Sequence, residues 1–309
     1  MPLIPEYQAM MDQLKEVGAP PIQDMAVAEV RAMYKVSQPV YEDLSVFLIK
    51  QSEISGPAGP IPVRIYVPSA AGPHPMIFLY HGGGWVIGDL DTADSEAREL
   101  CVGTNALVIS VDYRLAPENQ FPAAVDDSFA VFKQANQLAQ QFNGDPERIA
   151  VAGDSAGGNL AAVMAQMARD QNGPAICFQL LVYPVTDGTN LERNSYHEMA
   201  NGYLLTRDAM VWFWDHYCPE EDRGNPLASP LLADNFSNLP PALVMTAKYD
   251  PLCDEGEEYA KRLSSAGTSV EHKHYEGYMH GFFSHTPMIP SIRESMEDAC
   301  SALRRVFKS

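Results

Sequence analysis

The chain has 309 residues, of which 46% are hydrophobic and 20% are charged, the composition of a globular protein large enough to bury a substantial core. Its 40 acidic residues against 21 lysines and arginines give a formal net charge of −19, which repels phosphate backbones, so we expect no nucleic-acid partner. Five widely spaced cysteines without a C-x-x-C pair indicate neither a disulfide framework nor a zinc site, and they predict the reduced thiols of a cytoplasmic protein.

The N-terminal 45 residues have a helical pattern and precede the first expected strand. They contain no signal-peptide pattern, and no stretch of the chain is apolar over the length of a membrane span, so we expect no stable membrane insertion. Together with residues 188–238, which include the aromatic stretch DAMVWFWDHYC, residues 1–45 are predicted to form a helical cap. Residues 46–187 and 239–309 would form one catalytic core. The alternative is that each cap segment is only a surface helix packed on that core.

From residue 63 onward, short β-rich runs alternate with helical patterns. The expected strands are 63–67, 76–80, 106–111, 149–153, 178–183, 242–247 and 270–275. The expected helices are 92–102, 122–141, 156–170, 254–265 and 291–307. Several of the strands are continuous apolar runs, which is typical of strands buried on both faces. This alternation predicts an α/β fold with a mostly parallel central sheet and helices on both of its faces.

Three consecutive glycines follow the second expected strand, in the sequence HGGGW at 81–85. Glycine is costly in regular structure, so three in a row indicate a backbone shape or a close approach that a side chain would prevent. A phosphate-binding loop is the alternative. It is disfavoured because no Lys-Ser/Thr pair follows and the G-x-G-x-x-G spacing is absent.

Residues 149–170 predict a strand, a tight turn and a helix, with G-x-S-x-G at the turn from Gly153 to Gly157. This is the pattern of a nucleophile elbow, in which a strained turn lifts Ser155 out of the sheet edge near a helix N-terminus. A serine that attacks an acyl group creates an oxyanion, which needs backbone N–H donors about 3 Å away. We therefore interpret the triglycine segment as one wall of an oxyanion hole, and the N–H of Ala156 as the other.

Two acidic residues and several histidines lie downstream as partners for the serine. Asp250 directly follows the strand 242–247, where the sheet presents its loops, and is favoured as the acid; Asp254 is the alternative. His280 lies in a turn-like EGYMHG segment and is favoured as the base, because His272 and His274 alternate along a strand. His81 is interpreted as a scaffold for the glycine loop.

Five motifs resemble the hormone-sensitive-lipase family (bacterial family IV) of α/β-hydrolases. They are HGGGW at 81–85, DYRLAPENQFPAA at 112–124, GDSAGG at 153–158, YDPLCDEG at 249–256 and YMHGF at 278–282. The resemblance spans about residues 60 to 305, and residues 1–45 fit the family's helical cap.

The resemblance implies a serine carboxylesterase with an α/β-hydrolase fold. The nucleophile would be Ser155, the acid Asp250 and the base His280. The oxyanion donors would be Gly83, Gly84 and Ala156, with Gly82 as a donor in some geometries. The reaction needs no metal or organic cofactor, and it hydrolyses small-molecule esters with short to medium acyl chains. A homodimer through the sheet's edge strand is also expected.

The resemblance is incomplete at two positions, where the family often has Arg instead of Cys253 and Glu instead of Lys248. Neither position carries the family's chemistry, but both affect local charge.

Other residues are candidates for the surroundings of the site. Trp85, Tyr183, Tyr203 and Leu204 are candidate substrate-binding residues, and plain core packing is the alternative for each. Asp112, Arg114 and Glu118 are expected to form one structural polar network. Two other functions stay open, namely a non-catalytic ligand-binding protein of the same fold and an amidase or peptidase.

Overall fold

The computed structural model describes residues 1–18, 20–38 and 44–308. The predicted cap segment 1–45 therefore includes residues 19 and 39–43, which lie outside the described residues, as does residue 309 of the predicted core. The strands of the described chain are β1 (Leu48–Gly56), β2 (Gly59–Val67), β3 (His74–Tyr80), β4 (Leu107–Val111), β5 (Gly144–Asp154), β6 (Phe178–Val182), β7 (Ala242–Tyr249) and β8 (Val270–Met279).

Helices precede, separate and follow these strands. The α-helices are α1 (Pro5–Val17), α2 (Val27–Ser37), α3 (Asp94–Thr104), α4 (Ala123–Phe132), α5 (Ala135–Phe142), α6 (Ala156–Asp170), α7 (Asn194–Glu198), α8 (Arg207–Tyr217), α9 (Cys253–Ser265) and α10 (Glu294–Phe307). The 3₁₀ turns are η1 (Ile22–Asp24), η2 (Glu220–Asp222), η3 (Pro230–Leu232) and η4 (Pro290–Ile292). Among the described residues, no helix combines the length and the apolar character that crossing a membrane requires.

One sheet organises the fold, with the strand order β1-β2-β4-β3-β5-β6-β7-β8. The pairs from β4 to β8 are parallel, whereas β1 pairs with β2, and β2 with β4, in the antiparallel sense. The predicted α/β class and the mostly parallel sheet are thus confirmed. Strand β1 was not predicted, because its side chains are mostly exposed or half-buried and its sequence LIKQSEISG has no continuous apolar run.

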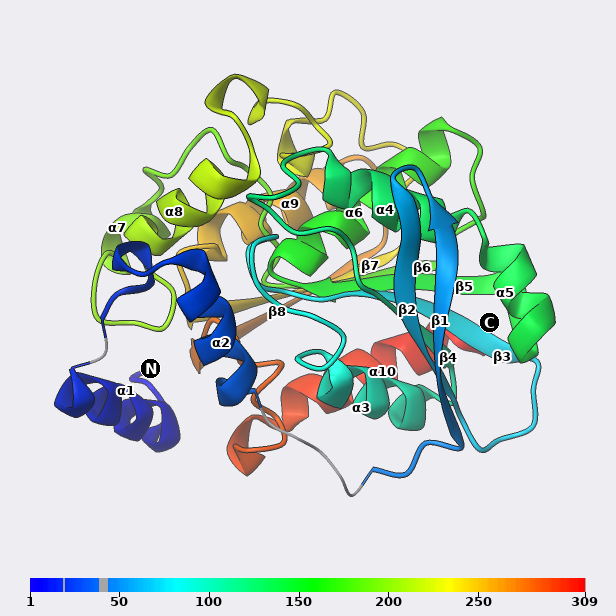
Figure 1. The fold of residues 1–309 in the computed structure, drawn as a ribbon, viewed down its shortest axis with the longest axis horizontal. Coiled ribbons are helices and arrows are strands. Elements are labelled where there is room, and N and C mark those ends of the chain that lie inside the picture. Colours follow the sequence, from blue (N-terminus) through cyan, green and yellow to red (C-terminus); the bar gives the residue numbers. More distant parts are fainter. Residues whose placement is uncertain (19, 39–43, 309) are drawn as a thin grey trace.

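Two apolar layers cover the two faces of the sheet. Along β3, the side chains of Met76 and Phe78 pack in the layer that contains α4, α6 and α9, whereas those of Ile77 and Leu79 pack in the layer that contains α3 and α10. Figure 1 shows α3 and α10 on one side of the sheet and α4, α6 and α9 on the other. The alternation of the strand side chains therefore accounts for the prediction of helices on both faces.

The predicted helices form close to their expected bounds, with one exception. The stretch 122–141 is divided into α4 and α5, because the chain turns at Lys133 and Gln134. In the predicted cap segments, α1 and α2 form before the sheet, and α7 and α8 form between β6 and β7. Helices α2 and α8 lie on the same side of the molecule (Figure 1).

The turn between β5 and α6 admits only small residues. A Cβ on Gly157 would lie 1.8 Å from the carbonyl oxygen of Tyr80, and a Cβ on Gly153 would lie 2.3 Å from the carbonyl carbon of Gly157. Both obstacles are backbone atoms, which cannot move without breaking the pairing of β3 with β5. The two glycines therefore let α6 begin directly against the end of β3.

We predict that Gly157→Ala destabilises the fold by more than about 4 kcal/mol, because the new methyl group collides with backbone. Thermal and chemical unfolding of the purified protein measure this. The matched control is Gly224→Ala, since a Cβ on Gly224 meets no atom within 4 Å. Equal melting temperatures for the two variants would contradict the packing argument.

Candidate active site

Three side chains from the carboxyl edge of the sheet form one chain of hydrogen bonds. The hydroxyl oxygen of Ser155 lies 3.1 Å from Nε2 of His280, and Nδ1 of His280 lies 2.8 Å from Oδ2 of Asp250. Ser155 follows β5, Asp250 follows β7 and His280 follows β8. Parallel strands end at a common edge, so residues 30 and 125 positions from His280 meet there.

The backbone of Ser155 is strained in the way that the sequence pattern predicts. Its φ is 54° and its ψ is −117°, a conformation that non-glycine residues rarely adopt and that costs on the order of 1–3 kcal/mol. The flanking chain holds it, since the N–H of Ser155 donates to the carbonyl of Val182 and its own carbonyl accepts from Val185 and Asn159. The turn exposes 6% of the residue, so only the reactive end of this serine is accessible.

Burial distinguishes the two candidate acids. Asp250 is fully buried, and its second oxygen accepts the N–H of Leu252 at 2.9 Å, which fixes the carboxylate toward His280. Asp254 instead accepts the N–H of Ser195 at 3.0 Å and lies in the first turn of α9. Of the two predicted alternatives, the structure therefore brings Asp250 to the histidine.

The glycine loop after β3 takes a left-handed path. Gly83 has φ 110° and Gly84 has φ 56°, and the carbonyl of Gly83 accepts the N–H groups of Val86 and Ile87. A Cβ on Gly83 would lie 2.2 Å from the carbonyl oxygen of Ile87. Among the described residues, the N–H groups of Gly83 and Gly84 donate to no other group.

Two more backbone donors belong to this region, and they differ. The N–H of Ala156 is in the first turn of α6, where an amide has no partner within its own helix. The backbone of Gly82 instead faces Asp154, since a Cβ on Gly82 would lie 2.3 Å from that carboxylate, and Gly82 opposes the rise in the pKa of Asp154. Gly83, Gly84 and Ala156 stay the predicted oxyanion donors.

His81 is a buried scaffold residue, as the sequence analysis predicts. Its Nδ1 bonds the carbonyl of Gly82 at 2.7 Å, and its ring stacks on Tyr113 with 4.3 Å between centroids. The hydroxyl of Tyr113 donates to the carbonyl of His81 at 2.7 Å. Burial lowers the pKa of His81 to about 4, so the ring is neutral near pH 7 and supports the start of the glycine loop.

The structure places the four candidate substrate-binding residues in different surroundings. Trp85 is fully buried and stacks on Tyr217 of α8, with 4.0 Å between centroids. Tyr183 lies beside the catalytic candidate His280, with 4.5 Å between centroids. Tyr203 and Leu204 are half-buried and pack against the layer that contains α3 and α10. Their contact with a substrate stays a prediction, and Tyr183 is the nearest of the four to the hydrogen-bonded chain by a ring contact.

Asp154, which adjoins Ser155, and Glu96, which interacts with Asp154, are buried carboxyl groups that the sequence analysis did not single out. Burial raises the pKa of Asp154 to about 6, and burial together with Asp154 and Glu99 raises the pKa of Glu96 well above its ordinary range. The hydroxyl of Tyr183 donates to Asp154 at 3.5 Å. Asp154 stands inside the GDSAGG motif next to Ser155, which is the signal that could have identified it.

The predicted network of Asp112, Arg114 and Glu118 is wrong. Arg114 pairs with Asp127 at 2.8 Å, whereas Glu118 pairs with Arg31 of the N-terminal helix α2 at 2.7 Å. The sequence pattern groups the three residues because they are neighbours in the chain, but the loop directs the side chains to different elements.

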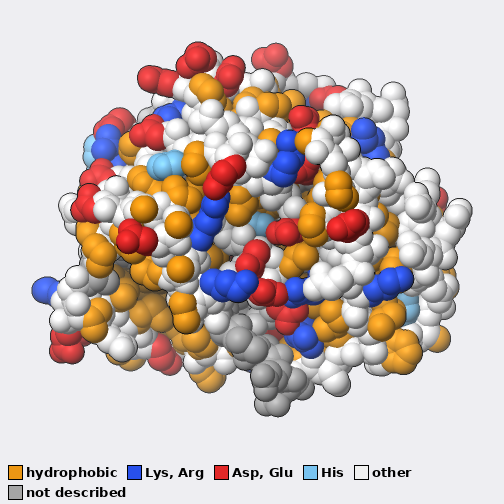
Figure 2. All heavy atoms as spheres, in the orientation of Figure 1, with side chains coloured by type: hydrophobic (Ala, Val, Ile, Leu, Met, Phe, Trp, Pro, Cys, Tyr) orange, Lys and Arg blue, Asp and Glu red, His pale blue; other side chains and the backbone are white. Residues whose placement is uncertain are grey.

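Helix α2 is tied directly to the glycine loop. Nε of Arg31 donates to the carbonyl of Val86 at 2.8 Å, and its other nitrogens bond Glu118 and the carbonyl of Ala116. One turn later, Lys35 donates to Asp89 and Asp91, each at 2.9 Å. Figure 2 shows basic and acidic side chains in contact across the middle of the face on which α2 lies. No local motif signals this contact, because its partners are distant in the chain.

A parallel sheet with a serine on a strained turn, and an aspartate–histidine pair at the same edge, is the architecture of an α/β-hydrolase. Residues 77–284 match the family model described as alpha/beta hydrolase fold. The chain is 46% identical over 258 residues to carboxylic ester hydrolase LipN of Mycobacterium tuberculosis, an alignment that covers 81% of this chain and 68% of LipN. It is 45% identical over 252 residues to carboxylesterase NlhH of the same species, covering 80% and 79% of the two chains.

A solved structure of an ester hydrolase resembles this chain over almost its whole length. The ester-hydrolase EH1AB1 from the metagenome of Lake Arreo, complexed with a derivative of bipyridine phosphonate, is 40% identical with a TM-score of 0.93. The match covers 99% of this chain and 100% of that one. The chain belongs to the α/β-hydrolase fold family, and within it to the hormone-sensitive-lipase type known as family IV.

We predict that replacing Asp154 with asparagine makes the folded state more stable near neutral pH. Its pKa is raised from 3.8 to about 6, so the ionised form is penalised in the folded state, by about 3 kcal/mol. The penalty is absent below about pH 4, grows as the pH rises through the window from 4 to 6, and is complete above it.

Chemical unfolding of wild type and Asp154→Asn at pH 4, 5, 6 and 7 measures this difference. The exposed Asp12→Asn variant serves as the control for loss of a surface carboxyl group. A stability gap that stays constant, or narrows, between pH 4 and 7 would refute the assignment.

Proposed function

We propose that the protein is a serine carboxylesterase in which Ser155 is the nucleophile, His280 the general base and Asp250 the residue that orients the imidazole. The observation that carries the proposal is the continuous hydrogen-bonded chain from Ser155 through His280 to the buried Asp250. The names of the relatives LipN and NlhH, a carboxylic ester hydrolase and a carboxylesterase, support the same reaction.

The reaction begins when the hydroxyl oxygen of Ser155 attacks the ester carbonyl carbon and its proton moves to Nε2 of His280. The N–H on Nδ1 of His280 meanwhile donates to Asp250, which stabilises the imidazolium without taking the proton. The negative oxygen of the tetrahedral intermediate accepts from the free N–H groups of Gly83, Gly84 and Ala156. These donors are held by backbone turns before substrate arrives, so no reorganisation is needed during the reaction.

The tetrahedral intermediate then collapses. The bond to the alcohol breaks, and the proton held by His280 leaves with the alcohol oxygen. Water next attacks the acyl-enzyme while His280 accepts one of its protons, and the second collapse releases the carboxylic acid and restores Ser155. Every proton in this cycle is carried by a residue of the chain, so the reaction requires no metal or organic cofactor.

The two cap segments, 1–45 and 188–238, act together over this site. Their described parts support the assignment, because Val30 of α2 and Phe213 of α8 belong to the same apolar cluster. A Cβ on Gly84 would lie 2.2 Å from the ring of Phe213, so α8 packs directly on the glycine loop. Arg31 reaches the same loop from α2. The cap and the oxyanion donors are therefore parts of one packed unit.

The substrates are small-molecule esters with short to medium acyl chains. Trp85, Tyr183, Tyr203 and Leu204 stay the proposed substrate-binding residues, Tyr183 lies beside His280, and the small exposed fraction of Ser155 favours compact acyl groups. The enzyme is cytoplasmic, which the five free cysteines support, and it forms a homodimer through the edge strand β8.

We predict that Ser155→Ala lowers kcat on p-nitrophenyl butyrate by about 10⁴-fold or more, because no other group supplies the nucleophile. The control is Ser301→Ala on α10, which keeps the wild-type rate. A fluorophosphonate labels the wild type and not Ser155→Ala.

Each alternative function has its own outcome in this experiment. Equal ester turnover by wild type and Ser155→Ala contradicts the assignment, and absence of both turnover and labelling in the wild type indicates a ligand-binding protein. Faster cleavage of a matched amide than of the ester indicates an amidase.

We predict that Arg31→Met lowers kcat on the same ester about tenfold and changes KM less than twofold. Its side chain holds the loop that carries the oxyanion donors, and one such donor is worth roughly 10²–10³ in kcat. Steady-state kinetics at several ester concentrations separates kcat from KM.

The matched control is Lys35→Met, which removes a positive charge from the same helix without touching Val86. We expect less than a twofold change in kcat for this variant. An Arg31→Met enzyme with reduced melting temperature but unchanged kcat would show that the contact only stabilises the fold.

A further inference from the structure

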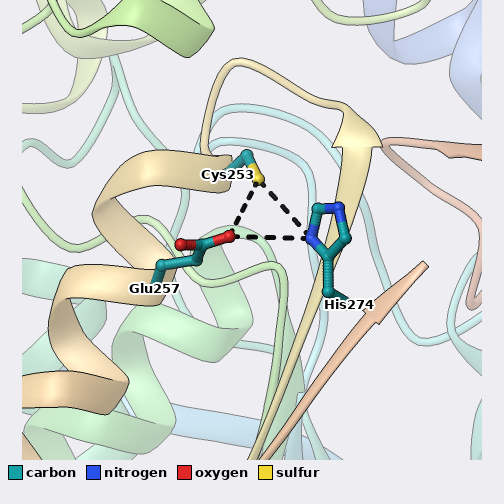
Figure 3. Close-up of side chains that lie close together, drawn as sticks. All are labelled: Cys253, Glu257 and His274. Carbon is teal, nitrogen blue, oxygen red and sulfur yellow. Dashed lines mark hydrogen bonds and ion pairs between the residues drawn. The ribbon is translucent and has the colours of Figure 1, made fainter. Parts of the chain in front are cut away.

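A second group of chemically active side chains lies outside the hydrogen-bonded triad. Cys253 and Glu257 lie one helical turn apart on α9, and His274 lies on the edge strand β8 (Figure 3). Sγ of Cys253 is 3.9 Å from Oε1 of Glu257 and 3.8 Å from Nδ1 of His274, and the latter two atoms are 3.7 Å apart. Figure 3 shows the three side chains pointing toward a common centre.

These separations are too long for strong hydrogen bonds between the nitrogen and the oxygen atoms. They fit the spacing of ligands around a metal ion instead. A point equidistant from the three atoms lies about 2.2 Å from each, and zinc binds sulfur at about 2.3 Å and nitrogen or oxygen at about 2.0–2.2 Å. We propose that Cys253, Glu257 and His274 form a site for a thiophilic divalent cation such as Zn²⁺, with water as its fourth ligand.

The groups around these ligands suit a bound cation. The other ring nitrogen of His274 faces the carboxylate of Glu276 at 3.9 Å, on the side where metal-binding histidines commonly have an acidic partner. Oε2 of Glu257 pairs with Lys261 at 3.2 Å, which orients Oε1 toward the other two ligands. The thiol of Cys253 is mostly buried, so the site combines a protected sulfur with two half-buried ligands.

The protons of the site can rearrange when a metal binds. The hydroxyl oxygen of Thr246 lies 3.0 Å from Nδ1 of His274 and 2.9 Å from Nε2 of His272. That oxygen can accept a hydrogen bond from the Nε2–H of His272, and His274 in the tautomer without a proton on Nδ1 can then bind the metal through this atom as a neutral imidazole. Cys253 releases its thiol proton to solvent on binding, so affinity falls as pH is lowered. Asp250, Asp254 and Glu257 face this sulfur and favour a cation, whereas Lys248 opposes one.

The sequence analysis expected no zinc site, because Cys253 has no cysteine partner and His274 lies 21 positions away. The fold brings them together through the parallel pairing of β7 with β8 and the packing of α9 beside them.

The proposed metal site lies next to the proposed acid and base of the reaction. Asp250 lies just before α9, where its carbonyl accepts the N–H of Cys253, and His280 immediately follows β8. A metal at this site therefore clamps together the two elements that carry the acid and the base.

The test is a cobalt titration of the full-length, chelator-treated protein. We expect one Co²⁺ per chain, a near-ultraviolet charge-transfer band from a cobalt–thiolate bond, and displacement of the band by Zn²⁺. Cys253→Ser removes the band, and His274→Gln or Glu257→Gln raises the apparent Kd at least tenfold. The matched control is Cys177→Ser, which changes a half-buried cysteine outside the site and leaves band and affinity unchanged.

Zn²⁺ should also raise the melting temperature of the wild type and not of Cys253→Ser, since it binds only the folded site. Cobalt binding without a thiolate band, or binding that survives Cys253→Ser unchanged, overturns the proposal. If that variant does not fold, iodoacetamide labelling of the wild type decides, because Zn²⁺ must protect Cys253 and leave Cys177 reactive. Metal content and spectra are read without ester turnover, so failure here is distinct from failure of the proposed esterase function.

Discussion

The structure depends on one close approach of backbone to backbone, at the turn between β5 and α6. Gly157 lies so near the carbonyl of Tyr80 that the start of α6 is pressed against the end of β3. That contact forces Ser155 into its left-handed conformation and sets the N–H of Ala156 beside the glycine loop that follows β3. The proposed nucleophile and the proposed oxyanion donors thus depend on a single packing constraint, and the strain at Ser155 is offset by the regular pairing of the strands around it.

Electrostatics at this edge is unusual for a chain with a formal net charge of −19. Two carboxyl groups, Asp154 and Glu96, are buried near this turn, and burial raises the pKa of both. Asp154 accepts the hydroxyl of Tyr183 and lies against the backbone of Gly82. Burying this carboxylate costs stability, and that cost comes from placing it between the glycine loop and the strand that precedes Ser155.

The cap is bound to the site by charge and by packing at once. Arg31 bonds the backbone carbonyls of Val86 and Ala116, and Phe213 fills the space that a side chain at Gly84 would need. A change in the cap therefore reaches the oxyanion donors through direct contacts. The proposed metal site acts on the proposed acid and base instead. It links the two elements next to Asp250 and His280. The reacting groups are thus held from two independent directions.

The sequence by itself determined most of the sheet and helices, and it supported Ser155 and His280 as the proposed nucleophile and base. Continuous apolar runs identify β3 to β7, because strands buried on both faces leave few polar positions, and the glycines around Ser155 are required by steric limits that a sequence displays directly. Tertiary structure decided the rest. It brought Asp250 rather than Asp254 to His280 by burying one carboxylate and turning the other toward Ser195. It also separated Arg114 from Glu118 and brought Cys253 to His274. Such pairings depend on which strands are neighbours, and a local pattern of residues carries no information about partners that the chain reaches only after it has folded.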